Sequence, residues 1–268
     1  MLEVKNVTKI FKKGTINEKV ALNGLSLHLD PGDYVTVIGG NGAGKSTLMN
    51  CISGTMMLDG GSVSLNGKDL SRLPEYKRAA MIGRVFQDPM MGTAATMQIE
   101  ENLALANRRG KVHGLRWGIT ASERELFRSK LAELNLGLED RMTTKAGLLS
   151  GGQRQAVTLL MATLKTPELL LLDEHTAALD PITAGKVLEL TDKIVTKEKL
   201  TTLMITHNMK DAIAHGNRLI MMDSGRIVAD IKGEEKKNLT VKDLLDLFSS
   251  TCEERNLTDK MMLSDAGD

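Results

Sequence analysis

The sequence predicts an α/β fold in which a mostly parallel sheet is covered by helices, and two observations lead to it. The β-branched run over 34–38 is typical of a buried strand, and it passes through a glycine-rich turn into a helix-like segment over 45–53. Strand character returns at 169–172 and at 202–206, with a helix expected from Pro181 to about residue 196 between them. Strand, helix and strand in this order imply parallel pairing.

The remaining elements complete one domain. Further short strands are expected at residues 2–8, 25–29, 62–66 and 84–86. From about residue 88 to residue 166 the pattern is helical, so we expect a helical subdomain inserted into the sheet. Residues 218–223 and 226–230 predict a closing hairpin. We therefore expect a single domain over 1–248, followed by a loosely ordered polar tail over 249–268.

Composition argues against several classes of function. With a formal net charge of +1 the chain has no basic surplus, so we expect no nucleic acid partner. No stretch approaches the roughly 18 apolar residues that a membrane-spanning helix needs, and the charged N-terminus does not resemble a signal peptide. Cys51 and Cys252 lack metal-ligand spacing and fit a reduced cytosolic setting. Any membrane role must therefore come through a partner.

The segment after the strand 34–38 fits the pattern G-x-x-x-x-G-K-[ST], with a strand before it and a helix after it. Its glycines let backbone N–H groups curl around a phosphate, and the helix N-terminus adds a positive dipole end. Lys45 would reach the β- and γ-phosphates, and the Ser46 hydroxyl would bind Mg²⁺. An ordinary glycine turn is the alternative, but the complete pattern rarely arises by chance. The expected ATP-binding residues are Gly39, Gly40, Asn41, Gly42, Ala43, Gly44, Lys45, Ser46 and Thr47.

Two adjacent acids end the apolar strand 169–172. Asp173 and Glu174 would repel each other at the edge of a sheet unless a cation or solvent is present. We expect Asp173 to hold Mg²⁺ through water and Glu174 to polarise the attacking water. A strand that simply leaves the core is the alternative, and the phosphate loop in the same sheet weighs against it.

A second candidate anion receptor lies at Ser150, Gly151, Gly152 and Gln153. Ser150 and Gln153 form an S-x-x-Q capping box for a helix expected to run to about Lys165. That structural role does not explain two consecutive glycines, which are costly at the start of a helix. A helix N-terminus stripped of side chains and carrying a serine hydroxyl can receive a phosphate. One chain would then hold two receptors for a γ-phosphate.

These motifs come in the order found in ABC transporter ATPases, and the chain resembles that family from Leu2 to about Phe248. The motifs are the phosphate loop, Gln87 within 85–89, the segment 149–153, Asp173 with Glu174, the segment 178–180, and His207. The resemblance implies a P-loop NTPase RecA-like core, an antiparallel β-subdomain and an inserted α-helical subdomain. It also implies Mg-ATP as the bound nucleotide and a homodimer that closes on ATP and reopens after hydrolysis.

The resemblance assigns further roles residue by residue. It implies that Ser150, Gly151, Gly152 and Gln153 complete the ATP site of the second copy, and that His207 contacts the γ-phosphate. Gln87 would bind the metal and link it to the helical subdomain. Asp180 would cross the dimer interface, although Asp180 followed by Pro181 is also a good N-cap. Phe11 would stack on adenine, with surface anchoring as the alternative.

His175 departs from the family, most of whose members have proline after the catalytic acid. The surrounding residues resemble a bacterial subgroup described as uptake ATPases for aromatic amino acids of the tryptophan and tyrosine type. That resemblance implies integral-membrane permease subunits, a substrate-binding lipoprotein, and a place on the inner face of the cell membrane. It is the only ground for import over export. His175 is expected to be a hydrogen-bonding loop residue, with coupling to pH as the alternative.

Two segments could either contact a partner or have a purely structural role. The basic insertion over 107–120 could lie near lipid headgroups or the permease, or be a solvated loop. Met90, Met91 and Met97 could line an adaptable groove for a permease helix, or fill the core.

Other functions fit less well. An ABC ATPase that acts on DNA or ribosomes would carry coiled-coil arms, a zinc hook or two cassettes, and this chain has one cassette without sustained heptads. A non-hydrolysing regulatory subunit would lack the catalytic acid or the signature, and both Glu174 and Ser150 are present.

Overall fold

The computed structural model describes residues 1–110 and 118–249, in which the strands form two sheets. The smaller sheet is antiparallel in the order β2-β1-β4-β5, with β1 Leu2–Phe11, β2 Lys19–Leu29, β4 Gly60–Leu65 and β5 Lys68–Asp69. The larger has the order β10-β9-β3-β8-β7-β6, with β3 Tyr34–Gly39, β6 Ile82–Val85, β7 Leu169–Asp173, β8 Thr202–Ile205, β9 Arg218–Asp223 and β10 Arg226–Lys232. All neighbours in the larger sheet pair in parallel except β9 with β10.

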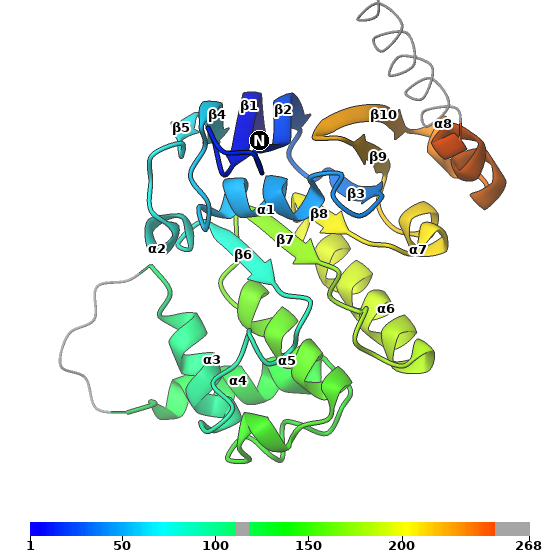
Figure 1. The fold of residues 1–268 in the computed structure, drawn as a ribbon. Coiled ribbons are helices and arrows are strands. Elements are labelled where there is room, and N and C mark those ends of the chain that lie inside the picture. The colour runs from blue at the N-terminus through cyan, green and yellow to red at the C-terminus, as the bar shows by residue number, and fades with distance from the viewer. Residues whose placement is uncertain (111–117, 250–268) are drawn as a thin grey trace, which may run out of the picture.

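Figure 1 labels the helices. α1 (Lys45–Ser53) follows β3. A helical group below the sheets contains α3 (Ile99–Asn107), α4 (Ala121–Ala132) and α5 (Gly151–Thr163). Further helices are α2 (Glu75–Arg78), α6 (Pro181–Glu198), α7 (Met209–Ala214) and α8 (Glu234–Lys237), a short 3-10 helix spans Ala146–Leu148, and residues 241–249 are also helical. No helix among the residues described combines the length and apolar character needed to cross a membrane.

The strand β7 shows why the larger sheet needs cover on both faces. Leu169 and Leu171 belong to a cluster with residues of α1 and the antiparallel sheet, whereas Leu170 and Leu172 pack with residues of α5 and α6. All four leucines are fully buried. A continuous apolar run is what a strand buried on both faces requires. The phosphate loop and the two acids therefore leave a rigid, doubly covered sheet at the same edge.

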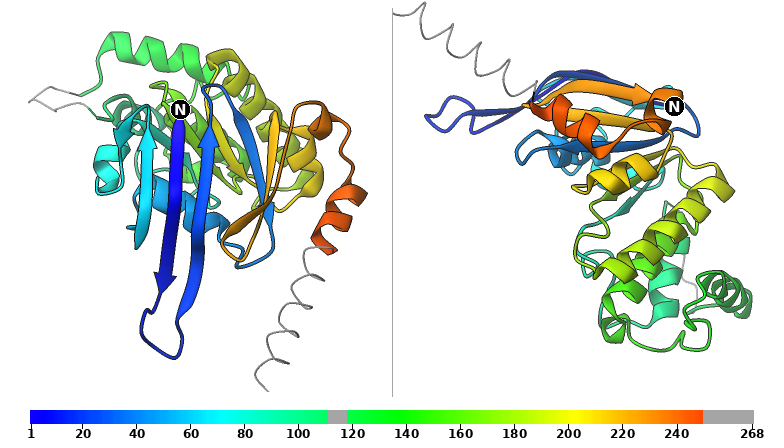
Figure 2. Two further views of the ribbon diagram at one scale, coloured as in Figure 1. Left: turned by 90° about the horizontal axis from the view of Figure 1, so that it is seen from above. Right: turned by 90° about the vertical axis from the view of Figure 1, so that its right-hand side faces the viewer.

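Several predicted elements are confirmed. The helix over 45–53 matches α1, the predicted parallel pairing is present, and the closing hairpin turns at Ser224 and Gly225. β1 is longer than predicted because its ladder continues through a bulge until Phe11 pairs with Lys19. The left view of Figure 2 shows this hairpin extending past its neighbours.

The prediction of helix from residue 88 onward was wrong for its first part, because α3 begins at Ile99. Residues 88–98 form a loop that packs closely on α5: a Cβ at Gly92 would lie 2.3 Å from Thr158 Cγ2. Pro89 lacks a backbone donor within this segment. The predicted tail over 249–268 lies, apart from Ser249, outside the described residues.

Candidate active site

The phosphate loop has the backbone that its glycines were expected to allow. Gly44, the residue before α1, has φ +100°, and a Cβ there would lie 2.5 Å from the carbonyl oxygen of Ala21. A Cβ at Gly39 would lie 2.3 Å from the carbonyl oxygen of Met222. Both glycines are therefore required by close backbone approach.

Lys45 lies inside this loop and is only 6% exposed. Its Nζ donates hydrogen bonds to the carbonyl oxygens of Gly39, at 2.7 Å, and Gly40, at 3.1 Å. Burial lowers the pKa of the Lys45 ammonium, while the charges of Glu174 and Asp173 act in the opposite direction. The ammonium group is therefore held within the loop by the carbonyl oxygens of Gly39 and Gly40.

A pocket of about 230 Å³ joins the loop to two residues from other strands. Asn41, Gly42, Ala43, Gly44, Lys45, Ser46 and Thr47 line it together with Glu174 and His207. Glu174 follows β7 and His207 follows β8, and these strands are parallel neighbours. The carboxyl ends of parallel strands meet at one edge of a sheet, where open α/β sheets bind ligands.

Glu174 and His207 contact each other directly in this pocket. Glu174 Oε1 lies 2.6 Å from His207 Nε2. The glutamate is 8% exposed and has a left-handed backbone with φ +46°, held by its N–H, which donates to the carbonyl oxygen of Ile205 at 3.0 Å. Strained backbone of this kind persists where the surroundings fix it, and it is common at functional sites.

Asp173 and Gln87 line a neighbouring cavity of about 630 Å³ rather than the pocket of the phosphate loop. Asp173 Oδ2 accepts a hydrogen bond from Arg84 Nη2 at 3.1 Å. Arg84 also donates to Asn50 Oδ1 of α1 at 2.8 Å and lies over the ring of Phe86, 4.8 Å from its centroid. Arg84 thus ties β6, β7 and α1 together beside the candidate metal ligand.

Arg84 and Lys19 were not among the predicted site residues. An arginine inside a short apolar strand is the sequence signal that could have identified Arg84. Lys19, at the start of β2, has its Nζ 3.3 Å from where a Cβ at Gly42 would lie. Because Lys19 pairs with Phe11 in the ladder, the end of β1 is brought toward the phosphate loop. Phe11 itself is half-buried there.

Ser150, Gly151, Gly152 and Gln153 lie at the start of α5, outside the phosphate-loop pocket. The predicted capping box is confirmed: Ser150 Oγ accepts from the Gln153 N–H at 3.2 Å, and the Gln153 side chain accepts from the Ser150 N–H at 3.2 Å. Gly152 also has a packing role, since a Cβ there would lie 2.1 Å from Thr183 Cγ2 of α6. Gly151 is exposed.

Asp180 caps α6, as the alternative to its interface role proposed. Its Oδ1 accepts from the Thr183 N–H at 3.0 Å, and Pro181 opens the helix. The side chain is nevertheless exposed, so it remains accessible to a partner.

His175 is a buried hydrogen-bonding residue, 2% exposed. Its Nε2 lies 3.1 Å from the hydroxyl of Thr191, which itself donates to the carbonyl oxygen of Val187 at 2.8 Å, so the imidazole Nε2–H is the donor. Burial lowers the pKa of His175 to about 4; His215 also lowers it, and Asp192 opposes the shift. The loop that follows Glu174 is thereby fixed to α6.

Met90 and Met91 are 58% and 68% exposed, so the core-filling alternative is wrong for both. Met91 lines the same cavity as Gln87 and Asp173, whereas Met97 is half-buried. Arg109 belongs to the basic insertion, and its guanidinium donates hydrogen bonds to the carbonyl oxygens of Ala162 and Lys165. Lys111, His113, Arg116 and Trp117 lie outside the described residues.

Comparison with known proteins gives consistent similarities. Residues 22–177 match the family model described as ABC transporter. The chain is 44% identical over 248 residues to a tyrosine transport ATP-binding protein of Clostridioides difficile, covering 92% of this chain and 98% of the relative. It is 38% identical over 231 residues to a methionine import ATP-binding protein of Rhizobium johnstonii, covering 85% of this chain but only 60% of that longer relative.

Solved structures resemble the fold as well. A dimeric ATP-binding cassette in a post-hydrolysis state with ADP and Pi superposes with a TM-score of 0.74 at 29% identity, covering 87% of this chain and 98% of that chain. A nucleotide-free cassette of an ABC transporter superposes with the same score, 0.74, at 28% identity, covering 92% of this chain and 95% of that chain.

Proposed function

The chain belongs to the ABC transporter family as an ATP-hydrolysing subunit, and from this premise we propose that two copies close around two Mg-ATP molecules to drive uptake of a small solute. The observation that carries the proposal is the pocket in which the phosphate loop, Glu174 and His207 meet. The donors present fit the nucleotide complex. Mg²⁺ typically takes one or two carboxylates together with phosphate oxygens. Asp173 offers a carboxylate from the adjoining cavity, and Ser46 offers a hydroxyl oxygen within the loop.

Each residue of the site would then have a distinct task. Mg²⁺, when bound, neutralises part of the charge on the phosphates. Lys45 would exchange the carbonyls of Gly39 and Gly40 for phosphate oxygens. Glu174 would accept a hydrogen bond from the attacking water, and His207 would turn from the carboxylate toward the γ-phosphate. Gln87, in the adjoining cavity, would bind the metal and so link the metal site to the helical group.

The second phosphate receptor would act on the partner copy. The segment 150–153 lies outside the pocket of its own phosphate loop, and Ser150 and Gly151 at its start are exposed. A helix N-terminus of this kind receives anions. Asp180, exposed at the start of α6, would lie at the same interface.

A mixed dimer tests this arrangement. One subunit carries Glu174→Gln and the other carries Ser150→Arg, which blocks the receptor. Each homodimer has both sites damaged and should be almost inactive. In the mixed dimer one site combines both defects while the other is intact, so mixing should restore ATPase activity.

The control places both changes on one subunit and pairs it with an unaltered one. Each site then carries one defect, and activity should stay low. If a single chain completed its own site, the unaltered subunit would keep full activity and the pattern would reverse. Equal activity in both pairings would refute completion by the partner.

The transported solute and the remaining partners are proposed from the relatives. One relative is named for tyrosine transport and others for methionine import, which supports an amino acid as solute and inward transport. We infer integral-membrane permease subunits, a substrate-binding lipoprotein, and a location at the inner membrane face through the permease. Uptake of labelled tyrosine by the assembled transporter, set against methionine, tests the substrate. Failure to carry either would contradict it.

A further inference from the structure

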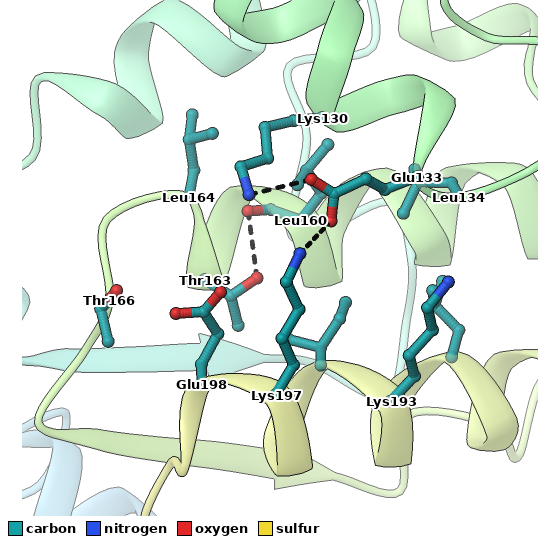
Figure 3. A pocket seen from close by; sticks show the side chains of 12 residues that line it. Lys130, Glu133, Leu134, Leu160, Thr163, Leu164, Thr166, Lys193, Lys197 and Glu198 are labelled. Atoms are coloured by element: carbon teal, nitrogen blue, oxygen red, sulfur yellow. Dashed lines mark hydrogen bonds and ion pairs between the residues drawn. The ribbon is translucent and has the colours of Figure 1, made fainter.

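The helices α5 and α6 pack against each other, and Leu159 and Ala162 of α5 share a core cluster with Leu188 and Val195 of α6. Near their N-termini Gly152 and Thr183 are too close to admit a Cβ. Toward their C-termini they enclose a cavity of about 240 Å³, which the end of α4 covers. Figure 3 shows the side chains that point into it, among them Leu160, Leu164 and Lys197. This cavity is separate from the phosphate-loop pocket and has no part in the function proposed above.

Five of the twelve residues that line the cavity are aliphatic, and we refer to these five as its floor. They are Leu134, Leu160, Leu164, Leu190 and Ile194. The Thr163 hydroxyl beside them already donates to the carbonyl oxygen of Leu159 at 2.8 Å, so it does not call for a polar ligand group. A nucleoside or a sugar, with hydroxyls on every side, would leave its polar groups unpaired against this floor. The body of a matching ligand is therefore a hydrocarbon.

The rim of the cavity is charged, with three lysines against two glutamates. Glu133 accepts from Lys130 at 3.1 Å and from Lys197 at 2.8 Å, and these bonds lower its pKa, so this carboxylate stays ionised and engaged. Lys193 lies one helical turn before Lys197 on α6 and makes no ion pair within residues 1–110 and 118–249. Like charges four residues apart on a helix repel. Glu198 also lines the cavity and makes no ion pair among the described residues, so three lysines and two glutamates leave a net surplus of one positive charge, and Lys193 is exposed.

We propose that this cavity binds a small amphipathic carboxylate, with its apolar body on the leucine floor and its carboxylate between Lys193 and Lys197. The head group would relieve the repulsion between the two lysines. The hydrocarbon would fill the cavity beside the contact between α5 and α6. A volume of about 240 Å³ is at the small end for ligand sites, which commonly span about 300–1,000 Å³. This limits the body to roughly the size of a medium-length carboxylic acid.

Occupation of the cavity would act on the rest of the molecule through α6. The ion pair between Glu133 and Lys197 joins the helical group to α6, and a bound carboxylate would compete for Lys197. The same helix carries Thr183 against Gly152 and Thr191 against His175. A ligand here would thus stabilise the packing of α6 on α5. This packing supports both the segment 150–153 and the loop that follows Glu174.

The experiment is calorimetric titration of the full chain with octanoate, with 1-octanol as the uncharged probe. We expect saturable binding of one octanoate per chain with a sub-millimolar Kd, and at least tenfold weaker binding of octanol, because a charge-assisted hydrogen bond is lost. Lys193→Gln should weaken octanoate binding about tenfold. Leu190→Phe, which fills the cavity, should abolish it.

The matched control is Lys186→Gln, which changes an exposed lysine on the same helix outside the cavity and should leave the affinity for octanoate unaltered. Thermal unfolding of each variant without ligand establishes that it is folded. Equal affinity for octanoate and octanol, equal effects of Lys193→Gln and Lys186→Gln, or no saturable binding of octanoate at millimolar concentration would each overturn the proposal. None of these outcomes bears on the composite ATP site, which the mixed dimers test separately.

Discussion

His175 connects the loop that follows Glu174 to α6 through a neutral imidazole. This makes the stability of the fold depend on pH. Its pKa is lowered from 6.5 to about 4, first by burial. A group whose pKa is lower in the folded chain takes up its proton more readily when the chain unfolds. The stabilising free energy is therefore complete above the ordinary pKa, and it decreases as the pH falls from about 6.5 to about 4.

This yields a prediction for His175→Gln, which keeps a donor for Thr191 but does not titrate. Between about pH 7.5 and about pH 5 the wild type should lose about 2 kcal/mol more of its free energy of unfolding than the variant. Urea denaturation at both pH values measures the difference. Parallel loss in the two proteins would show that His175 is charged in the folded chain or does not control acid stability.

Phe11 is expected to stack on the adenine ring of the nucleotide. If it stacks on adenine, Phe11→Ala should weaken ATP binding by about 1–3 kcal/mol and leave saturated turnover nearly intact. Phe11→Tyr should be close to wild type, because it keeps the ring. Calorimetric titration with ATP gives the affinities. A variant that loses thermal stability at unchanged affinity would support anchoring of the β1–β2 hairpin instead.

At the level of elements, the contact between α5 and α6 gives Gly152 two possible duties that can be separated. Gly152→Ala should destabilise the fold by about 1–3 kcal/mol, because the new Cβ collides with Thr183 Cγ2. Adding Thr183→Ser removes that methyl group and should recover most of the stability, as denaturant unfolding would record. The Gly151→Ala variant is the control, since only Leu179 Cδ2 lies within 4 Å of its Cβ, at 3.2 Å.

ATPase activity of the double variant then distinguishes packing from phosphate binding. Recovery of stability without recovery of ATPase activity would mean that phosphate binding by the segment 150–153 also needs a residue without a side chain at Gly152. Recovery of both would reduce Gly152 to a packing residue. No recovery of stability would contradict the steric explanation.

The elements that could be predicted are those whose cause is local. The helix over 45–53 follows directly from a β-branched strand, a glycine loop and Lys45, so its bounds were predicted correctly. The loop over 88–98 could not be told from helix, because its course is set by distant contacts such as that of Gly92 with Thr158. α2, α7 and α8 have six residues or fewer, too few for a periodic pattern to show.

The site divides in the same way. The phosphate loop, Glu174 and His207 are each marked by sequence pattern, and the structure brings them into one pocket. Arg84 and Lys19 were missed, because their importance comes from pairing with residues on other strands. The double role of Thr183, which donates to the Asp180 cap and packs against Gly152, likewise depends on how α5 and α6 meet.

On the surface of the molecule, the cavity lined by Gln87 and Asp173 is also lined by the exposed Met91, and the neighbouring Met90 is exposed too. We predict that Met90→Gln or Met91→Gln leaves the ATPase activity and thermal stability of the isolated subunit unchanged, because neither side chain is in the core. In the assembled transporter the same changes should lower solute uptake per ATP hydrolysed. ATPase and uptake measured on one reconstituted preparation give this ratio. Lowered stability of the isolated subunit, or an unaltered ratio, would contradict docking at this surface.

The ammonium group of Lys45 has given up most of its contact with water in the folded chain and is bonded to two carbonyl oxygens of its own loop. Removing a charged amine from water costs free energy, and here that cost is incurred during folding rather than when a nucleotide arrives. A phosphate that enters needs only to replace one set of oxygen acceptors with a more negative set. Preorganisation of this kind raises affinity by lowering the work done on binding. If Lys45 receives the phosphate as proposed, nucleotide binding should also stabilise the fold against unfolding.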